Sequence, residues 1–267
     1  MISFHGVGKS FRAEDGGGYT AVRDVDLCAR HGRFVSIVGP SGCGKSTVLN
    51  MAAGLLAPTV GRIHSFGATL EGRNSHASYM FQQDALLPWK NIIDNVALGL
   101  RFRHVHRDEA RARASDWLAR VGLSRVERSY PHQLSGGMRK RAAIAQSWIV
   151  DPDLLLMDEP FSALDVQTRK MMEDELLQLW GESTKTVLFI THDLDEAISL
   201  SDEVLLMSAG PGSTVVARYE IDLPRPRNLL DIRTTDAFQE IYLRIWSRLK
   251  EEVATSYARS QEPTRNG

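Results

Sequence analysis

Short apolar runs alternate with polar and glycine-rich segments along most of the chain. RFVSIV (33–38), LLLMDEP (154–160) and VLFITHD (187–193) each contain a β-branched or aliphatic run typical of a buried strand. STVLNMAAGLL (46–56) follows the first of these runs and favours a helix. Buried strands followed by helices are typical of open α/β sheets, which bind ligands at the carboxyl ends of their strands.

The middle of the chain has a different pattern. Residues 91–150 favour helices that are charged on one side, as in RDEARARASDWLARVGL (107–123), and they separate the two groups of expected strands. The arginines of this region fit a solvated helix face. We therefore expect a helical insertion within an α/β core.

The composition changes again after residue 223. LPRPRN (223–228) interrupts regular structure, and the next helix, within residues 236–253, carries an apolar stripe. We expect this stripe to pack on the chain's own core, the alternative being a partner surface. Residues 254–267 are polar and aperiodic, and we expect them to be disordered. The stripe consists of Phe238, Ile241, Tyr242, Ile245, Trp246, Leu249 and Val253.

A glycine-rich segment, GPSGCGKST (39–47), follows the first strand. Its glycines allow consecutive N–H groups to point at phosphate oxygens, Lys45 adds a positive charge, and Ser46 offers an oxygen to Mg²⁺. The helix that follows presents its N-terminus to the anion. This segment predicts a nucleotide-phosphate site.

Two carboxylates end the second apolar strand. Asp158 and Glu159 emerge at the carboxyl end of LLLMD, where an α/β sheet places its ligands. Asp158 is suited to the hydration shell of Mg²⁺, and Glu159 to polarising the attacking water. Together with the phosphate loop, they predict nucleotide hydrolysis.

A third segment, QLSGGMRKRAAIAQ (133–146), begins a helix with an anion-binding N-terminus. Ser135 is the expected N-cap, and Gly136 and Gly137 allow close backbone approach. With the motifs above, this segment resembles the signature of the ABC-type ATPases. Gln82 in MFQQDALLPW (80–89) matches the family's Q-loop, SALD (162–165) its D-loop, and His192 its switch histidine. The resemblance covers roughly residues 1–223.

The resemblance implies a fold and a set of site residues. The fold is α/β, with a P-loop NTPase (RecA-like) core over residues 1–90 and 151–223. This core includes an N-terminal antiparallel β subdomain. A helical subdomain at 91–150 is inserted into it, and a C-terminal extension follows at 224–253. The implied catalytic residues are Glu159, His192 and Gln82, and Mg²⁺ is held by Ser46, Gln82 and Asp158. The implied ATP-binding residues are Phe11, Gly39, Pro40, Ser41, Gly42, Cys43, Gly44, Lys45, Ser46 and Thr47. The signature residues are Leu134, Ser135, Gly136, Gly137 and Met138, and the D-loop residues are Ser162, Ala163, Leu164 and Asp165.

The adenine-stacking aromatic has two candidates upstream of the phosphate loop. Phe11 directly follows the first expected strand, as the family's stacking residue does, whereas Tyr19 comes after a glycine-rich insertion. We favour Phe11. The alternative is that it packs within the small N-terminal sheet.

The resemblance also implies partners. In this family two cassettes meet head to tail, so that each ATP lies between one chain's phosphate loop and the other chain's signature. LLPWKNIIDNVALGL (86–100), SAGPG (208–212) and DLPRPR (222–227) further resemble the ATP-binding subunits of nitrate, sulfonate, taurine and bicarbonate importers. Such subunits drive integral membrane permeases that receive substrate from an extracytoplasmic binding protein. They therefore lie at the cytoplasmic face of the membrane.

Composition agrees with this interpretation. The net charge of −1 argues against a nucleic-acid partner, and no stretch approaches a membrane-spanning length. Cys28 and Cys43 suggest no disulfide framework, and we expect no metal other than Mg²⁺. The main rival is a non-transport ABC ATPase of DNA repair or translation, but only 111 residues separate Ser46 from Asp158, too few for the long coiled coil of repair members.

Overall fold

The computed structural model describes residues 1–12 and 17–261, which form parts of two compact units. One unit comprises Met1–Ser75 with Thr186–Gly267, and the other comprises His76–Lys185. Residues 76–90 and 151–185, which we expected in the core, thus belong to the same unit as the helical insertion. The reason is local packing: strand β6 (Ala77–Met80) pairs with β7 (Leu154–Asp158), and helix α5 (Gly136–Trp148) packs against β6 and against α6 (Val166–Gly181).

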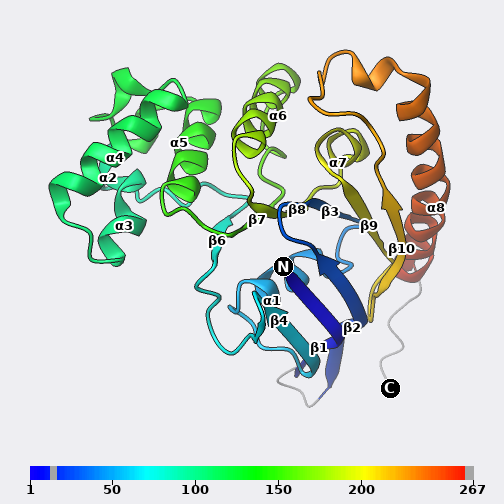
Figure 1. Cartoon of the computed structure of the whole chain (residues 1–267). Helices are drawn as coiled ribbons and strands as arrows, with labels where there is room; N and C mark the ends of the chain where they lie inside the picture. Colours follow the sequence, from blue (N-terminus) through cyan, green and yellow to red (C-terminus); the bar gives the residue numbers. More distant parts are fainter. Residues whose placement is uncertain (13–16, 262–267) are drawn as a thin grey trace. The chain divides into compact units, whose positions relative to one another are not determined.

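An antiparallel sheet begins the first unit (Figure 1). Strand β1 (Ile2–Arg12) lies between β2 (Gly18–Ala29) and β4 (Val60–Ser65), and β4 also pairs with the short β5 (Ala68–Thr69). Apolar side chains of β1 and β2 are buried on one face of this sheet, as expected for half-buried antiparallel strands.

Parallel strands form the second sheet of this unit. The expected strands are present as β3 (Phe34–Val38) and β8 (Thr186–Ile190), which pair in parallel. Strand β9 (Glu203–Met207) pairs in parallel with the other edge of β3, and β10 (Val215–Glu220) pairs antiparallel with β9. Every residue of β3 and β8 is buried, which explains why their sequences are almost entirely apolar.

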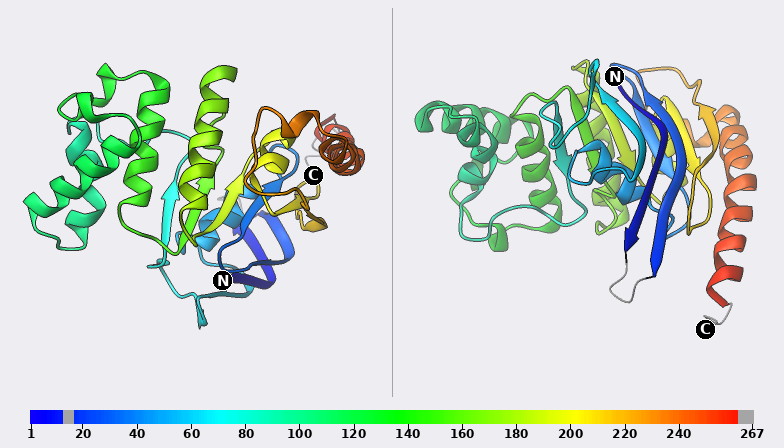
Figure 2. Two further views of the ribbon diagram at one scale, coloured as in Figure 1. Left: turned by 45° about the horizontal axis from the view of Figure 1, so that its top comes forward. Right: turned by 90° about the horizontal axis from the view of Figure 1, so that it is seen from below.

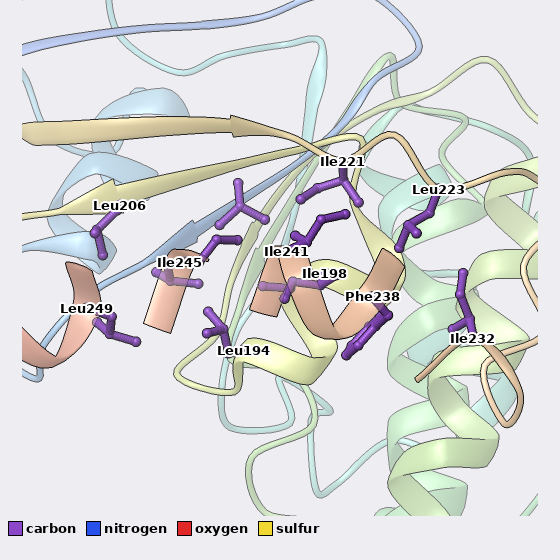
Figure 3. Packing of buried hydrophobic residues seen from close by; sticks show 13 residues of the cluster. Leu194, Ile198, Leu206, Ile221, Leu223, Ile232, Phe238, Ile241, Ile245 and Leu249 are labelled. Atoms are coloured by element: carbon purple, nitrogen blue, oxygen red, sulfur yellow. The ribbon is translucent and has the colours of Figure 1, made fainter. Parts of the chain in front are cut away.

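Helices α7 (Leu194–Leu200) and α8 (Asp236–Gln261) cover this sheet next to β9 and β10 (Figures 1 and 2). The 3₁₀ turn η3 (Ile232–Thr234) precedes α8. Figure 3 shows the core that they share, in which residues of α8 face those of α7, β9 and the segment after β10. Each fully buried side chain of this size contributes roughly 1.5–3 kcal/mol. The α8 residues of this core are Phe238, Ile241, Ile245 and Leu249, and Tyr242 and Val253 pack at its margin.

Helix α8 departs from the sequence expectation in two respects. Trp246 was expected in the buried stripe, but its side chain is 44% exposed because it lies one residue past Ile245 on the helix. The helix also continues to Gln261, so the expectation of disorder was wrong for residues 254–261; residues 262–267 lie outside the described part of the chain. Arg259 supports the added turns by donating to the carbonyls of Ala209 and Gly210.

The proline-rich segment before α8 is anchored by two arginines. Arg225 pairs with Asp202 at 2.8 Å, and the buried Arg227 donates to backbone carbonyls that include Ser201 at 2.7 Å and Ser199 at 3.0 Å. Burial, with a smaller contribution from Arg225, lowers the pKa of Arg227 to about 10, so it stays charged at neutral pH. The segment interrupts regular structure, as its sequence predicted, and its arginines hold it to the end of α7.

No helix within residues 1–12 and 17–261 is long and apolar enough to cross a membrane.

The second unit combines the parallel pair of strands β6 and β7 with helices. Besides α5 and α6, the helices of the second unit are α2 (Ile92–Val96), α3 (Leu98–Phe102) and α4 (Arg107–Arg120), with 3₁₀ turns η1 (Ser124–Val126) and η2 (Pro131–Gln133).

Candidate nucleotide site

The phosphate loop connects β3 to α1 (Lys45–Ala52) in the first unit. Gly42 and Gly44 adopt φ angles of 76° and 91°, where a side chain is strained, and Gly44 also lies against β2. A Cβ at Gly44 would come within 2.6 Å of a Val22 methyl group, and one at Gly39 within 2.9 Å of the Met207 carbonyl oxygen. Conformation therefore requires Gly42, whereas both conformation and space require Gly44, and a close backbone contact requires Gly39.

Lys45 lies within this loop. Its side chain is buried, and its ammonium group donates to the carbonyls of Gly39 at 2.9 Å and Pro40 at 3.0 Å. Ser46 is exposed and Thr47 partly exposed in the first turn of α1. The loop thus offers a cation and a hydroxyl at a helix N-terminus, the arrangement that suits a phosphate group with Mg²⁺.

His192 belongs to the same sheet edge. It follows β8, which pairs in parallel with β3, and the Thr191 N–H donates to the carbonyl of Ile37 near the end of β3. Adjacent parallel strands end on the same side of a sheet, and the His192 side chain is exposed there. Asp193 caps α7 through the N–H groups of Asp195 and Glu196, which fixes the chain directly after the histidine.

Asp158 ends β7 in the second unit and has a partner that the sequence analysis missed. The Tyr79 hydroxyl donates to Asp158 Oδ2 at 3.2 Å, and burial, with a smaller contribution from Asp158, raises the Tyr79 pKa. The Tyr79 ring stacks on Phe81 at 4.2 Å between centroids. Only the pairing of β6 with β7 reveals this contact, since the two residues are far apart in sequence.

Glu159 follows in a strained conformation. Its φ of 43° is uncommon for a residue other than glycine, which indicates that neighbouring contacts impose the backbone at this position. The Gln82 amide donates to the Glu159 carboxylate and to the Ser162 hydroxyl, both at 3.4 Å. The structure therefore brings the expected Q-loop, strand-end glutamate and D-loop together.

The signature segment has the expected cap. Ser135 is the N-cap of α5, and its hydroxyl accepts from the Met138 N–H at 3.3 Å. Leu134 is buried, whereas Ser135 is exposed, and Gly136 and Gly137 are partly exposed. A Cβ at Gly137 would lie 2.7 Å from a Thr168 methyl group, so this glycine is also required by packing.

Two basic residues connect the signature helix to the Q-loop. Lys140 is buried, donates to the Gln82 carbonyl at 2.7 Å and pairs with Asp84 at 2.9 Å. Arg139 pairs with the same carboxylate at 3.1 Å and donates to the Leu134 carbonyl. The charges on the signature helix, which the sequence alone left without a role, thus hold the Q-loop.

The D-loop ends at a helix cap. Ala163 is exposed, Leu164 is buried, and Asp165 caps α6 through the N–H groups of Thr168 and Gln167. Hydrogen bonding from Thr168 contributes most to holding the pKa of Asp165 below its ordinary value. Asp165 therefore stays ionised at neutral pH.

The two adenine candidates are neighbours across the first sheet. Phe11 in β1 lies directly opposite Tyr19 in β2, and the two side chains are 40% and 47% exposed. The Lys9 ammonium lies 5.4 Å from the centre of the Phe11 ring. Phe11 is therefore not packed within the sheet, and both rings are accessible to a base.

We predict that Phe11→Ala weakens ATP binding by roughly 1–2 kcal/mol, the usual contribution of base–aromatic stacking. Tyr19→Ala should have little effect and is the matched control, because it removes the facing aromatic of the same strand pair. Nucleotide titration of both variants provides the measurement. The reverse ranking assigns the stacking role to Tyr19.

A parallel sheet whose strand ends in a glycine loop carrying a lysine is characteristic of P-loop nucleotide-binding proteins. The chain belongs to the ABC transporter family, whose model matches residues 22–162. It is an ATP hydrolase of the cassette type, with the P-loop α/β fold predicted from the sequence.

Two relatives that are similar to this chain are import proteins by name. The chain is 50% identical over 192 residues to the taurine import ATP-binding protein TauB of Rhizobium johnstonii, covering 72% of this chain and 73% of that protein. It is 41% identical over 229 residues to the nitrate import ATP-binding protein NrtD of Synechococcus elongatus, covering 85% and 83%. The dimeric structure of the cassette MJ0796 in a post-hydrolysis state with ADP and Pi matches with a TM-score of 0.74 and 30% identity, covering 84% of this chain and all of that one.

Proposed function

We propose that the chain is the ATP-hydrolysing subunit of an importer for a small anion or organic solute of the nitrate, sulfonate or taurine type. In this proposal Lys45 and the loop N–H groups bind the ATP phosphates, and Ser46, Gln82 and Asp158 hold Mg²⁺. Glu159 activates the attacking water, assisted by His192 and Gln82. The names of the taurine and nitrate relatives support the import assignment.

The proposal includes a head-to-tail dimer and a pair of permease subunits at the cytoplasmic face of the membrane. An extracytoplasmic binding protein would deliver the substrate to these permeases. The dimeric structure of MJ0796, a related cassette, supports the pairing. Ser135, Gly136 and Gly137 of one chain would then contact the ATP held by Lys45 of the other.

The observation that carries the transport proposal is the exposed Trp89. This side chain is 71% exposed in the loop that follows Gln82, whereas the neighbouring Leu86 is buried. The buried Asn95 holds the loop: its amide accepts from the Leu87 N–H at 2.7 Å and donates to the carbonyls of Leu87 and Lys90. A large apolar side chain presented on a fixed loop usually marks a contact with a partner.

We predict that Trp89→Ala impairs transport and permease-stimulated ATP hydrolysis while leaving nucleotide binding unchanged. Because Trp89 is exposed, the variant should unfold at the wild-type temperature. The measurement is ATPase activity in proteoliposomes that contain the permease found to co-purify with this chain, together with its binding protein. Trp246→Ala on α8 is the control, since it removes the same side chain from another exposed position.

Stimulation that survives in Trp89→Ala would remove the loop from permease docking. The absence of any permease that binds the chain would favour a non-transport ABC ATPase. Uptake of nitrate, taurine and alkyl sulfonates by the reconstituted system would identify the transported solute.

A further inference from the structure

The loop between β9 and β10, residues 208–214, lies against the phosphate loop. The buried Ser213 hydroxyl donates to the carbonyl of Cys43. A Cβ at Gly210 would lie 3.2 Å from the Gly42 carbonyl oxygen and 3.5 Å from the Cys43 Cα, so the two backbones are close. The position of the 208–214 loop therefore restricts the backbone of the phosphate loop.

The last turns of α8 hold this loop from its other side. The Glu252 carboxylate accepts from the Ala209 N–H at 3.0 Å, and its side chain is 12% exposed. Arg259, two turns further along the same helix face, donates to the carbonyls of Ala209 at 3.1 Å and Gly210 at 2.9 Å. Both backbone groups of Ala209 are thus bound by α8.

These contacts are separate from the apolar packing of α8. The buried stripe of the helix ends at Leu249 with Val253 at its margin, whereas Glu252 and Arg259 bind backbone. Glu252 also interacts electrostatically with the phosphate loop. Burial is the main cause that raises the pKa of the Cys43 thiol, and Lys45 lowers this pKa. The negative charge of Glu252 raises it further by a smaller amount. A chain of contacts therefore runs from α8 through Ala209, Gly210 and Ser213 to Cys43.

We propose that Glu252 and Arg259 are positioning residues for nucleotide binding, which act by fixing the 208–214 loop against the phosphate loop. The inference rests on the proposed role of residues 39–47 in binding phosphate. It gives the end of α8, which the sequence analysis expected to be disordered, a function at the nucleotide site.

The experiment compares Glu252→Ala with Glu252→Gln in the full chain, using Mg-ATP titration and steady-state hydrolysis. Glu252→Ala should weaken ATP binding and raise KM about three- to tenfold, as expected for one lost hydrogen bond at a positioned backbone, with kcat changed less than about twofold. Glu252→Gln should bind ATP nearly as the wild type does, because its amide oxygen still accepts from Ala209. Glu240→Ala is the control, since Glu240 is an exposed carboxylate near the start of the same helix.

Arg259→Ala provides an independent test near the helix end, where the side chain is exposed and loss of folding is not expected. It should raise the KM for ATP as Glu252→Ala does, and Arg259→Lys should recover part of the affinity. Wild-type affinity in both alanine variants would overturn the inference, as would equal loss in Glu252→Ala and Glu252→Gln. Lys45→Ala separates the two proposals: unchanged ATP binding in that variant contradicts the phosphate loop itself, whatever the α8 variants show.

Discussion

Glu159→Gln should bind Mg-ATP with wild-type affinity and lower its turnover by a few orders of magnitude. Positioning and activating the attacking water dominates this chemistry, and an amide cannot polarise water as a carboxylate does. Glu159 follows β7 with a φ of 43°, in contact with the Gln82 amide. The substitution keeps the size of the side chain, so the backbone at this position should be unchanged.

The measurement is single-turnover hydrolysis together with nucleotide titration. Glu182→Gln is the control, since Glu182 is an exposed carboxylate of the same unit that pairs with Arg120. Turnover in Glu159→Gln close to the wild-type rate would remove Glu159 from its proposed role. A loss of ATP binding together with turnover would indicate a structural role for this carboxylate.

The sequence predicted those parts of the fold that depend on local pattern. Continuous apolar runs identified β3, β7 and β8 because these strands are buried on both faces, and the segment after 223 was recognised by its prolines. The Ser135 cap was predicted from residue type and spacing alone, and the structure confirms it.

Contacts that depend on strand pairing or on loop packing were not predictable in this way. Tyr79 reaches Asp158 only because β6 lies beside β7 in one register, and Asn95 was indistinguishable from a surface amide until its bonds to Leu87 and Lys90 were visible. Arg227 was interpreted only as part of a segment that interrupts regular structure, although its guanidinium donates to several backbone carbonyls.

The end of α8 was missed for a related reason. Apolar periodicity stops at Val253, so hydrophobic pattern gave no reason for the helix to continue. Its last turns are instead held by Arg259, whose guanidinium donates to the carbonyl of Ala209 in the 208–214 loop. Ala209 lies 50 residues earlier in the chain. Side chain to backbone bonds of this range leave no periodic signal in a sequence.

The shared site gives the second large expected effect. Homodimers of Ser135→Arg and homodimers of Lys45→Ala should both lose ATP hydrolysis. Ser135→Arg replaces the small N-cap of α5 with a bulky cation, and Lys45→Ala removes the positive charge that binds phosphate. Ser124→Arg is the control for the first variant, since it adds the same cation at an exposed position of the same unit.

Mixing the two inactive variants then discriminates shared from separate sites. In a head-to-tail mixed dimer both lesions fall on one composite site, so the other keeps an intact Lys45 facing an intact Ser135. Hydrolysis should return above that of either homodimer, provided that one intact site suffices for turnover.

With Glu159→Gln added to both chains, the mixed dimer should trap a single ATP, which tests the pairing without requiring turnover. Sedimentation should detect ATP-dependent dimers of Glu159→Gln alone. A monomer that hydrolyses ATP at full rate, with a rate per chain independent of concentration, would contradict the shared site and with it the proposed role in transport, since α5 would then present its glycine N-terminus to no nucleotide.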